Sequence, residues 1–386
     1  MIGDIVMPRI LRIGGGAVRE TAAVLGQLDL HRPLIITDRT LAEIGHLRRL
    51  TDVLDEAELD WAAFEDVVED PTDISVAAGL AALEAGDFDC LIGFGGGSSM
   101  DTAKAMSFLH ANGGHVRDYR APFRIDRPGP PLILIPTTGG TGSEVTRWCV
   151  ITDTERDEKL NLSGLACVAT AAIVDYEFTK TKPYRLSADT GVDCLTHAIE
   201  AYVGSRAIPF TDTFALSAMR LIAKNIRRAC DDPDDDRARE AMTLGATQAG
   251  IAFSNASVAL VHGMSRPIGA FFHVPHGLSN AMLLPAVTAF SVGGALARYA
   301  DCARNIGAAD DSVGDQAAAQ ALVEALRALN RDLSVPSPKA YGIDAAEYDR
   351  LVPVMAEQAL ASGSPAFNPR APTAAEIEAL YREIWD

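Results

Sequence analysis

The sequence is poor in positive charge. Its 34 lysines and arginines stand against 52 aspartates and glutamates, which gives a formal net charge of −18 at pH 7. A nucleic-acid partner requires a basic surface that attracts phosphates, and the eight histidines cannot reverse this balance. We therefore expect no nucleic-acid partner.

The sequence also lacks cysteine motifs. There is no CxxC spacing and no dense pairing among Cys90, Cys149, Cys167, Cys194, Cys230 and Cys302. This scatter argues against a disulfide framework or a zinc knuckle and suits buried thiols in a reducing compartment. The first ten residues, MIGDIVMPRI, carry no apolar core of signal-peptide length. We expect a cytoplasmic protein.

One stretch without charged residues tests whether the chain contains a membrane span. It runs from Thr243 to Ser265, contains no Lys, Arg, Asp or Glu, and is interrupted by Gln248, Asn255, His262 and three glycines. A bilayer would leave these polar groups poorly satisfied. We expect a buried helix of a large soluble protein here, and no membrane partner.

The first half of the chain alternates short apolar segments with helical ones. Expected strands are Arg32–Asp38, Cys90–Phe94, Pro131–Thr138 and Ala171–Phe178, and expected helices are Ile74–Ala85 and a segment from Ser98 onward. Continuous apolar strands between helices predict a mostly parallel sheet covered by helices. The first half therefore has the pattern of an α/β dinucleotide-binding domain.

After about Tyr184 the β-branched runs disappear and Ala-rich helical patterns dominate, as in residues 209–229 and 317–333. The acidic stretch 229–240 is expected to be a solvated turn between two helices. We expect an α/β domain over residues 1–182 and an all-helical domain over 183–386.

One glycine-rich segment, GFGGGSSMDTAKA, places Gly95, Gly96 and Gly97 between a strand and a helix. Glycines there allow a phosphate to approach the N-terminus of the helix, where Ser98 or Ser99 can cap the helix and donate to an oxygen. The segment lacks the third glycine of G-x-G-x-x-G and the GK[ST] of a P-loop. A structural turn and a phosphate site both remain open. An earlier run, Gly14–Gly16, is expected to form a mainly structural turn.

A second polar segment, PTTGGTGSEVT (Pro136–Thr146), follows an apolar strand. It is either a plain loop or a surface shaped to a ligand, and its Glu144 either caps the next turn or balances a cation. Asp38 ends another strand, where an acidic side chain accepts hydrogen bonds from the ribose hydroxyls of NAD. The alternative is that Asp38 caps a helix or turn.

Four side chains have the chemistry of metal ligands. Asp193 and His197 are four residues apart in a helical pattern, so one carboxylate and one imidazole share a face. His262 and His276 follow in glycine-flanked apolar segments. Such an N/O ligand set suits Zn²⁺ or Fe²⁺, although an Asp-x-x-x-His pair is also common as a structural feature.

These segments occur in an order that resembles the iron-containing alcohol dehydrogenase family, often called group III. The resemblance runs from about Gly14 to Trp385 and is carried by GGGSSMDTAKA, PTTGGTGSEVT, GVDCLTHAIEAYV, HGMSRPIGAFFHVPHG, NAMLLP and ALNRDLSVP. It implies the group III alcohol dehydrogenase fold, which is also dehydroquinate synthase-like. In that fold an N-terminal α/β domain binds a nicotinamide cofactor in a cleft beside a helical, metal- and substrate-binding domain.

The resemblance also implies roles for single residues. The metal ligands would be Asp193, His197, His262 and His276, and the pyrophosphate would lie on the turn of Gly95, Gly96, Gly97 and Ser98. Thr137, Thr138, Thr141 and Ser143 would line the cofactor cleft, with Lys159 near the ribose. Asp38 matches the position that favours NAD over NADP.

This chain departs from the family pattern at Arg266, where many members carry a second histidine thought to assist proton transfer. A guanidinium cannot relay protons near neutral pH, but it can pair with an anion. Arg266 is therefore expected to favour substrates with a carboxylate, phosphonate or similar group, and His273 to take over the relay. The alternative is an internal ion pair at Arg266 with a relay through water. Phe253, Trp148 and Cys149 are expected at the pocket wall or in the core.

The resemblance predicts a metal-dependent NAD(H) alcohol dehydrogenase or aldehyde reductase that acts on a small alcohol or aldehyde. Three alternatives stay open: a metal-independent maleylacetate reductase-like enzyme, a dehydroquinate synthase-like lyase, and a non-enzymatic dinucleotide sensor. The family tendency also predicts a homodimer or a higher homo-oligomer.

Overall fold

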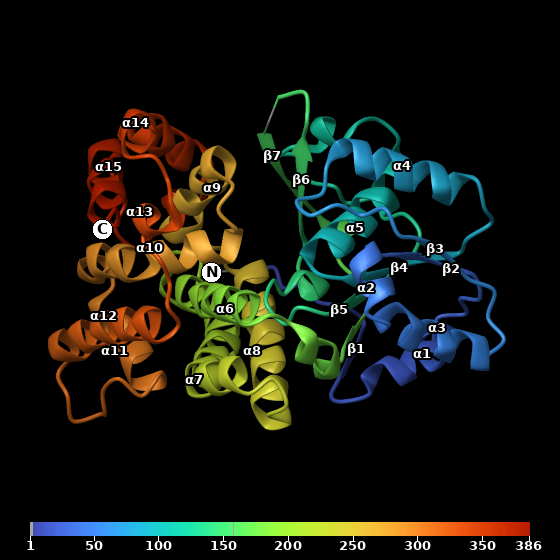
Figure 1. Ribbon diagram of the computed structural model, residues 1–386, viewed down its shortest axis with the longest axis horizontal. Coiled ribbons are helices and arrows are strands. Elements are labelled where there is room, and N and C mark those ends of the chain that lie inside the picture. Colours follow the sequence, from blue (N-terminus) through green and yellow to red (C-terminus); the bar gives the residue numbers. More distant parts are fainter. Residues whose placement is uncertain (1–2, 157) are drawn as a thin grey trace. The chain divides into compact units, whose positions relative to one another are not determined.

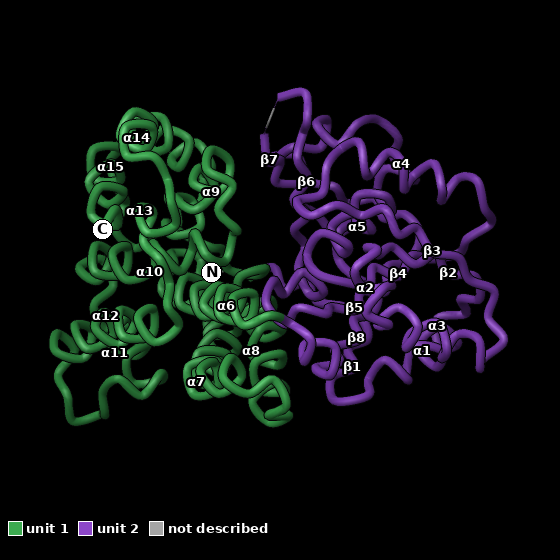
Figure 2. The backbone as a smooth tube through the Cα atoms, viewed as in Figure 1, with its two compact units in different colours: residues 1–3, 183–386 green, residues 4–182 purple. Residues whose placement is uncertain are grey.

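The computed structural model describes residues 3–156 and 158–386, which form two compact units (Figure 2). One unit comprises Asp4–Lys182, and the other comprises Pro183–Asp386 together with Gly3.

A six-stranded, all-parallel sheet forms the centre of the first unit (Figure 1). The strand order is β1-β8-β5-β4-β2-β3. The strands are β1 (Ile10–Ile13), β2 (Pro33–Ile36), β3 (Ala62–Phe64), β4 (Cys90–Gly95), β5 (Leu132–Pro136) and β8 (Ala171–Val174). The apolar runs expected to form strands therefore supply four of the six, β2, β4, β5 and β8.

Helices cover both faces of this sheet, because alternate residues of each strand point to opposite faces. Leu34, Leu91 and Leu134 pack with α4 (Asp73–Glu84) and α5 (Gly97–Asn112). Ile35 and Ile92 pack with α1 (Thr21–Gln27) and α3 (His46–Glu56) on the other face. Shorter helical segments are η1 (Ala17–Glu20), α2 (Arg39–Glu43), η2 (Val116–Tyr119), η3 (Ser143–Val145), η4 (Leu165–Cys167) and η5 (Tyr176–Thr181).

The pattern of buried apolar strands did not predict β1, β3 or the hairpin that β6 (Trp148–Asp153) and β7 (Glu158–Ser163) form. The edge strands β1 and β3 are only partly buried. The antiparallel hairpin mixes polar and apolar residues.

The second unit is helical and has one continuous apolar core. Its helices are α6 (Tyr184–Val203), α7 (Pro209–Asp231), α8 (Asp236–Asn255), α9 (Leu260–Phe272), α10 (His276–Ser291), α11 (Leu296–Asn305), α12 (Asp315–Asp332), α13 (Pro338–Tyr341), α14 (Ala345–Ala361) and α15 (Ala374–Glu383), with η6 (Val292–Gly294) and η7 (Ser364–Phe367). The acidic stretch forms the turn between α7 and α8, as expected. The predicted fold class, a parallel α/β domain followed by an all-helical one, is confirmed.

The prediction of a single buried helix from Thr243 to Ser265 is wrong. Two helices, α8 and α9, share this stretch and meet at a bend of 103°. No single described helix is long and apolar enough to cross a membrane, and only this bent pair passes that test, by length and composition alone.

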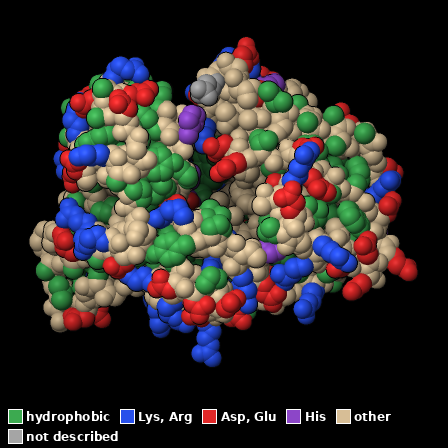
Figure 3. All heavy atoms as spheres, viewed as in Figure 1, with side chains coloured by type: hydrophobic (Ala, Val, Ile, Leu, Met, Phe, Trp, Pro, Cys, Tyr) green, Lys and Arg blue, Asp and Glu red, His purple; other side chains and the backbone are tan. Residues whose placement is uncertain are grey.

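Acidic and basic side chains are interspersed on the face shown in Figure 3. The net negative charge therefore does not gather into one patch there.

Candidate functional site

The carboxyl edge of the sheet contains a change of direction in the chain. Strand β2 leads through α2 and α3 to β3 on one side, whereas its neighbour β4 leads through α5 to β5 on the other. In open parallel sheets a crevice forms at such a switch point, and ligands bind there. Of the predicted cofactor residues, Asp38 follows β2, Gly95 ends β4, and Gly96–Ser98 follow it directly.

The structure brings the two predicted cofactor segments together at this edge. A Cβ atom added to Gly96 would lie 3.2 Å from the Thr138 methyl group, and one added to Gly97 would lie 3.2 Å from that of Thr141. Gly95 has φ +150°, and an added Cβ there would lie 2.4 Å from Ser99 Oγ. A side chain at Gly96 or Gly97 would therefore press on the second segment, and one at Gly95 would clash with Ser99. Gly96, Gly97 and Ser98 remain partly exposed, as a ligand surface needs.

Three buried hydroxyls at this edge have no hydrogen-bond partner within the described residues. They are Thr37 Oγ1, Ser99 Oγ and Thr138 Oγ1, and they follow β2, β4 and β5, three adjacent strands. A buried polar group without a partner costs free energy unless a ligand or water satisfies it. These hydroxyls, the glycines and the N-terminus of α5 fit a phosphate-containing ligand.

Asp38 caps helix α2, because its Oδ1 accepts a hydrogen bond from the Leu41 amide at 3.1 Å. The capping alternative is thus realised, and it occupies only one of the two carboxylate oxygens. The turn at Gly14–Gly16 is held by Asp175, whose carboxylate accepts from the amides of Gly16 and Val18. That turn has the structural role expected of it.

The remaining predicted cofactor residues are engaged with the protein itself. Lys159 Nζ lies 2.8 Å from Asp70 Oδ1. Ser143 Oγ accepts from Lys104 Nζ and donates to Asp101 Oδ1, both at 2.7 Å. Thr137 is buried, and its amide donates to Gly95 O. Glu144 is buried within η3. The contacts of these residues with a cofactor stay predictions.

The candidate metal ligands lie on three helices of the second unit. Helix α6 carries Asp193 and His197, α9 carries His262, and α10 begins at His276. Helix α10 packs against both α6 and α9 (Figure 1). Residues far apart in the sequence therefore meet.

The ligand atoms of Asp193, His262 and His276 lie within 4.8 Å of one another. Asp193 Oδ1 is 3.5 Å from His262 Nε2 and 3.9 Å from His276 Nε2. Two atoms that each bind one zinc ion at about 2.1 Å are at most about 4.2 Å apart. The distances from Asp193 thus fit a shared cation. The His276 side chain is 46% exposed, so the group is accessible from that side.

His197 lies beside these three side chains. Its Nε2 is 3.8 Å from Asp193 Oδ1, and its ring stacks on Phe253 and on His262 with centroids 4.2 and 4.5 Å apart. Burial lowers the pKa of His197 to about 3, so the imidazole is neutral and has a free lone pair, as a ligand must. Phe253 therefore packs on a candidate ligand.

Glu200, which the sequence interpretation missed, orients His262. Its Oε2 accepts from His262 Nδ1 at 2.7 Å and from the Ala259 amide at 2.8 Å. Its Oε1 accepts from the Val261 amide at 2.6 Å. One carboxylate thus caps the start of α9 and turns Nε2 of His262 toward Asp193, as outer partners of metal-binding histidines do. Glu200 lies seven residues after Asp193 on the same face of α6, and this spacing could have indicated it.

Asn280 is the second residue missed. It is fully buried, and its Nδ2 donates to Asp193 Oδ1 at 2.7 Å and lies 3.2 Å from Nε2 of both His262 and His276. An NH₂ group has two protons, so besides its bond to Asp193 it can donate to one of these two imidazole nitrogens, and that nitrogen must carry a lone pair. Asn280 follows His276 by four residues on α10, the same spacing as between Asp193 and His197.

The electrostatics of the group favour positive charge. Burial alone would lower the pKa of His262, but Glu200 and Asp193 outweigh it and raise this pKa to about 9. Burial would raise the pKa of Asp193, but the neighbouring imidazoles hold it well below its ordinary value. Two buried carboxylates beside the imidazoles therefore favour a positive charge at this place, which a divalent cation would supply in exchange for the proton on His262 Nε2.

Among the described residues, no hydrogen bond or ion pair joins Arg266 or His273, the predicted substrate and relay residues, to this group. Arg266 Nη1 donates to Ser364 Oγ at 3.1 Å, and no carboxylate lies within ion-pair distance of the guanidinium in the described part of the chain. Burial lowers the pKa of Arg266, and the charge of Glu200 opposes this. His273 is exposed and ends α9 with φ 52°.

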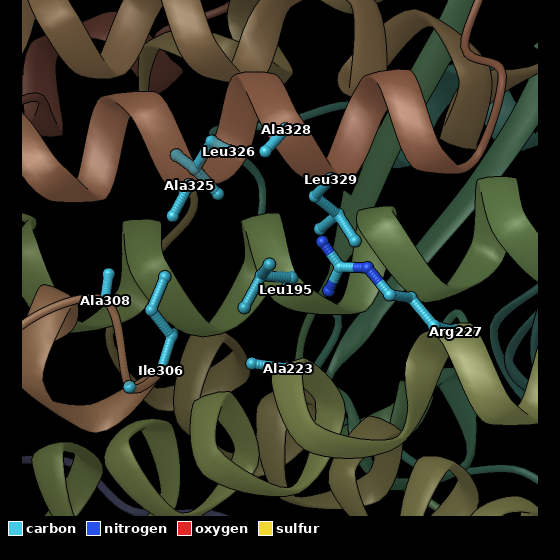
Figure 4. Close-up of a pocket in the computed structure, with 10 residues that line it drawn as sticks. Leu195, Ala223, Arg227, Ile306, Ala308, Ala325, Leu326, Ala328 and Leu329 are labelled. Carbon is cyan, nitrogen blue, oxygen red and sulfur yellow. The ribbon is translucent and has the colours of Figure 1, made fainter.

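A cavity of about 200 Å³ lies elsewhere in the helical unit (Figure 4). Leu195 of α6, Leu326 and Leu329 of α12 and several alanines line it, with Arg227 at one side. It contains none of the candidate ligands. The cavity is therefore separate from the metal group.

Family models cover nearly the whole chain. The model described as "Iron-containing alcohol dehydrogenase" matches residues 8–176, and "Fe-containing alcohol dehydrogenase family, C-terminal" matches residues 187–385.

Individual relatives agree with these matches. An NAD-dependent methanol dehydrogenase of Bacillus methanolicus is 37% identical over 96% of both chains. A lactaldehyde reductase of Escherichia coli K12 is 36% identical over the full length of both. Among solved structures, that of a 1,3-propanediol oxidoreductase superposes with a TM-score of 0.96 at 33% identity and covers all of both chains.

Proposed function

Because the chain belongs to the iron-containing alcohol dehydrogenase family, an oxidoreductase family that acts on CH–OH groups, we propose that it uses NAD(H) and a divalent cation. The reaction is hydride transfer between a small alcohol or aldehyde and the nicotinamide. The observation that carries this proposal is the convergence of Asp193, His262 and His276.

When bound, the cation polarises the alcohol or carbonyl oxygen as a Lewis acid and the nicotinamide accepts or donates the hydride. Asp193, His262 and His276 would hold the cation, with His197 as the fourth ligand. Glu200 keeps the proton of His262 on Nδ1, so that Nε2 stays free to bind. Asn280 holds the Asp193 carboxylate.

The carboxyl edge of the sheet supports the cofactor half of the proposal. Gly96 and Gly97 let the backbone approach a pyrophosphate, and the N–H groups that begin α5 favour its charge. The unpartnered hydroxyls of Thr37, Ser99 and Thr138 supply short donors. The free oxygen of Asp38 would accept from the ribose and disfavour the 2′-phosphate of NADP.

Fe²⁺ and Zn²⁺ both suit this ligand set, since imidazole and carboxylate accept either ion. We propose Fe²⁺ first, in keeping with the family, and keep Zn²⁺ as the alternative. A homodimeric or larger assembly and a cytoplasmic location stay predictions.

Arg266 supports a narrower substrate class. It is a partly buried cation whose described contact is the neutral Ser364 hydroxyl. A buried charge without an opposite charge in contact is costly, and an anionic group on the substrate would offset this cost. We therefore propose that the aldehyde or alcohol carries a carboxylate, phosphonate or similar group.

The test of the function is NADH oxidation with a panel of aldehydes, on metal-free protein and on protein reconstituted with each ion. We expect turnover only after reconstitution, with one ion per chain. Turnover without metal would support the maleylacetate reductase-like alternative. NADH binding without net oxidation would support a lyase or a sensor.

The test of the substrate class compares acidic and neutral aldehydes of equal length in wild type and Arg266→Ala. We expect kcat/KM to fall more for the acidic aldehyde. Equal losses for both would remove the anion-binding role of Arg266.

A further inference from the structure

Lys104 is a fully buried lysine that is not among the predicted site residues. It lies on α5, the helix that begins at Gly97, and its side chain has no exposure. Its Nζ donates to Ser143 O at 2.8 Å, to Ser143 Oγ at 2.7 Å and to Trp148 O at 2.7 Å. An ammonium group has three protons, and these three short bonds use them all.

Asp101, one turn earlier on α5, completes this buried network. Its Oδ1 lies 3.4 Å from Lys104 Nζ and accepts from Ser143 Oγ at 2.7 Å. Its Oδ2 accepts from the Val150 amide at 2.9 Å. The buried charge is therefore paired, and the pair joins α5 to η3 and to the start of β6.

The network reaches the candidate cofactor surface through Ser143. The Ser143 amide donates to Thr141 Oγ1 at 3.3 Å, and the Thr141 methyl group faces Gly97. The segment from Thr137 to Thr146 contains no strand or α-helix, and Gly139 and Gly142 have φ of 53° and 64°. Such a segment has little local structure to fix its position.

We infer that Lys104 and Asp101 are positioning residues that fix the 137–146 segment against the Gly96–Gly97 turn and thereby set the affinity for the dinucleotide. This inference rests on the proposed function. It assigns Ser143 an anchoring role, because its hydroxyl already donates to Asp101 and accepts from Lys104. The opposing view is that the network only stabilises the fold.

The main variant is Ser143→Ala, which removes the hydroxyl shared by Lys104 and Asp101 but leaves their ion pair. Its matched control is Ser107→Ala, which deletes a buried hydroxyl of the same helix that bonds to Pro130 O at 2.9 Å, outside the network. Lys104→Met is the stronger variant, since methionine keeps the length of the chain without the charge. If that variant does not fold, Ser143→Ala still decides.

The measurements are the Kd for NADH by fluorescence titration, the bound cation and the melting temperature. For Ser143→Ala we expect the Kd and the KM for NADH to rise about tenfold, the usual effect of a broken buried hydrogen bond. The KM for aldehyde, kcat at saturating NADH and the cation content should match those of Ser107→Ala.

Wild-type NADH affinity in both Ser143→Ala and Lys104→Met would overturn the inference. So would equal weakening in Ser107→Ala, which would indicate general destabilisation. If the wild-type protein itself binds no NADH, the proposed function fails and the inference falls with it.

Discussion

The two candidate sites are built from different parts of the polypeptide. The carboxyl edge of the sheet consists of glycines, backbone N–H groups and small hydroxyls, together with Asp38, a charged residue proposed to bind the ribose. The metal group in the helical unit consists of a carboxylate and imidazole side chains, of which Asp193 is held by Asn280 and His262 by Glu200. Ligand binding at the sheet edge depends on how closely the ligand can approach the backbone. Cation binding in the helical unit depends on the charges and lone pairs of side chains.

This difference predicts different sensitivities. A larger side chain at a glycine of the sheet edge should weaken cofactor binding. Loss of a charged side chain in the metal group should weaken cation binding. Each kind of change should leave the other site intact, because the network of each site lies within its own unit.

The largest effect is expected from Asp193→Ala, because Asp193 Oδ1 lies within 3.9 Å of Nε2 of all three histidines. Turnover and bound cation should fall well beyond the roughly 100-fold that a change outside the ligand set costs. NADH titration should give wild-type affinity, and the exposed Asp349→Ala should change neither. Loss of NADH binding in Asp193→Ala would contradict the separation of the two sites.

Glu200→Gln should have the next largest effect. Glutamine keeps the size of the side chain, but its NH₂ group cannot accept the bonds that Glu200 Oε1 or Oε2 now accepts. We expect cation affinity to weaken by about 10–100-fold, as measured by competition with a chelator. Unchanged affinity would mean that His262 is oriented without Glu200.

Gly96→Ala tests the sheet edge. Gly96 has a φ of −76°, which alanine also adopts without strain. The substitution therefore acts only through the added methyl group, which would lie 3.2 Å from the methyl group of Thr138. Overpacking costs about 1–3 kcal/mol, and we expect the Kd for NADH to rise at least about fivefold while bound cation is unchanged. The control is Gly26→Ala, where an added Cβ meets nothing within 4 Å. Equal binding by both variants would argue against a cofactor at Gly96.

Asp38→Asn should have the smallest effect. Asparagine keeps an oxygen that can cap α2 and removes the charge that opposes a 2′-phosphate. We expect NADPH use to improve by about fivefold or less, because exposed charges contribute about 1 kcal/mol or less. The ratio of kcat/KM for NADPH and NADH measures this. A ratio that does not change would leave Asp38 with its capping role alone.

The sequence predicted the fold where burial is uniform. The strands β2, β4, β5 and β8 are continuous apolar runs, whereas β1 contains Arg12 and β3 has only three half-buried residues. Edge strands and the β6–β7 hairpin lack the apolar run that marks a central strand. The break between α8 and α9 has no proline, and Glu200 of another helix caps the start of α9. Such a tertiary contact leaves no local signal.

The same contrast holds for the sites. Spacing of four residues on a helix indicated Asp193 and His197, and the structure places His262 and His276 beside them. Glu200 lies seven residues after Asp193 and Asn280 lies four residues after His276, so each shares a helix face with a candidate ligand, but their role appears only when three helices meet. The Lys104 network was missed because an isolated lysine in a helical pattern predicts an exposed side chain. Ser143 was predicted as a cofactor contact, yet its hydroxyl is bound within the protein.

The most direct test of the metal group is an anomalous difference map from crystals of protein reconstituted with Fe²⁺ or Zn²⁺, recorded at the absorption edge of that ion. We predict one peak within bonding distance of Asp193, His262 and His276, with His197 completing the ligand set. A peak bound by other residues, or fully active protein with no peak at these ligands, would contradict this account.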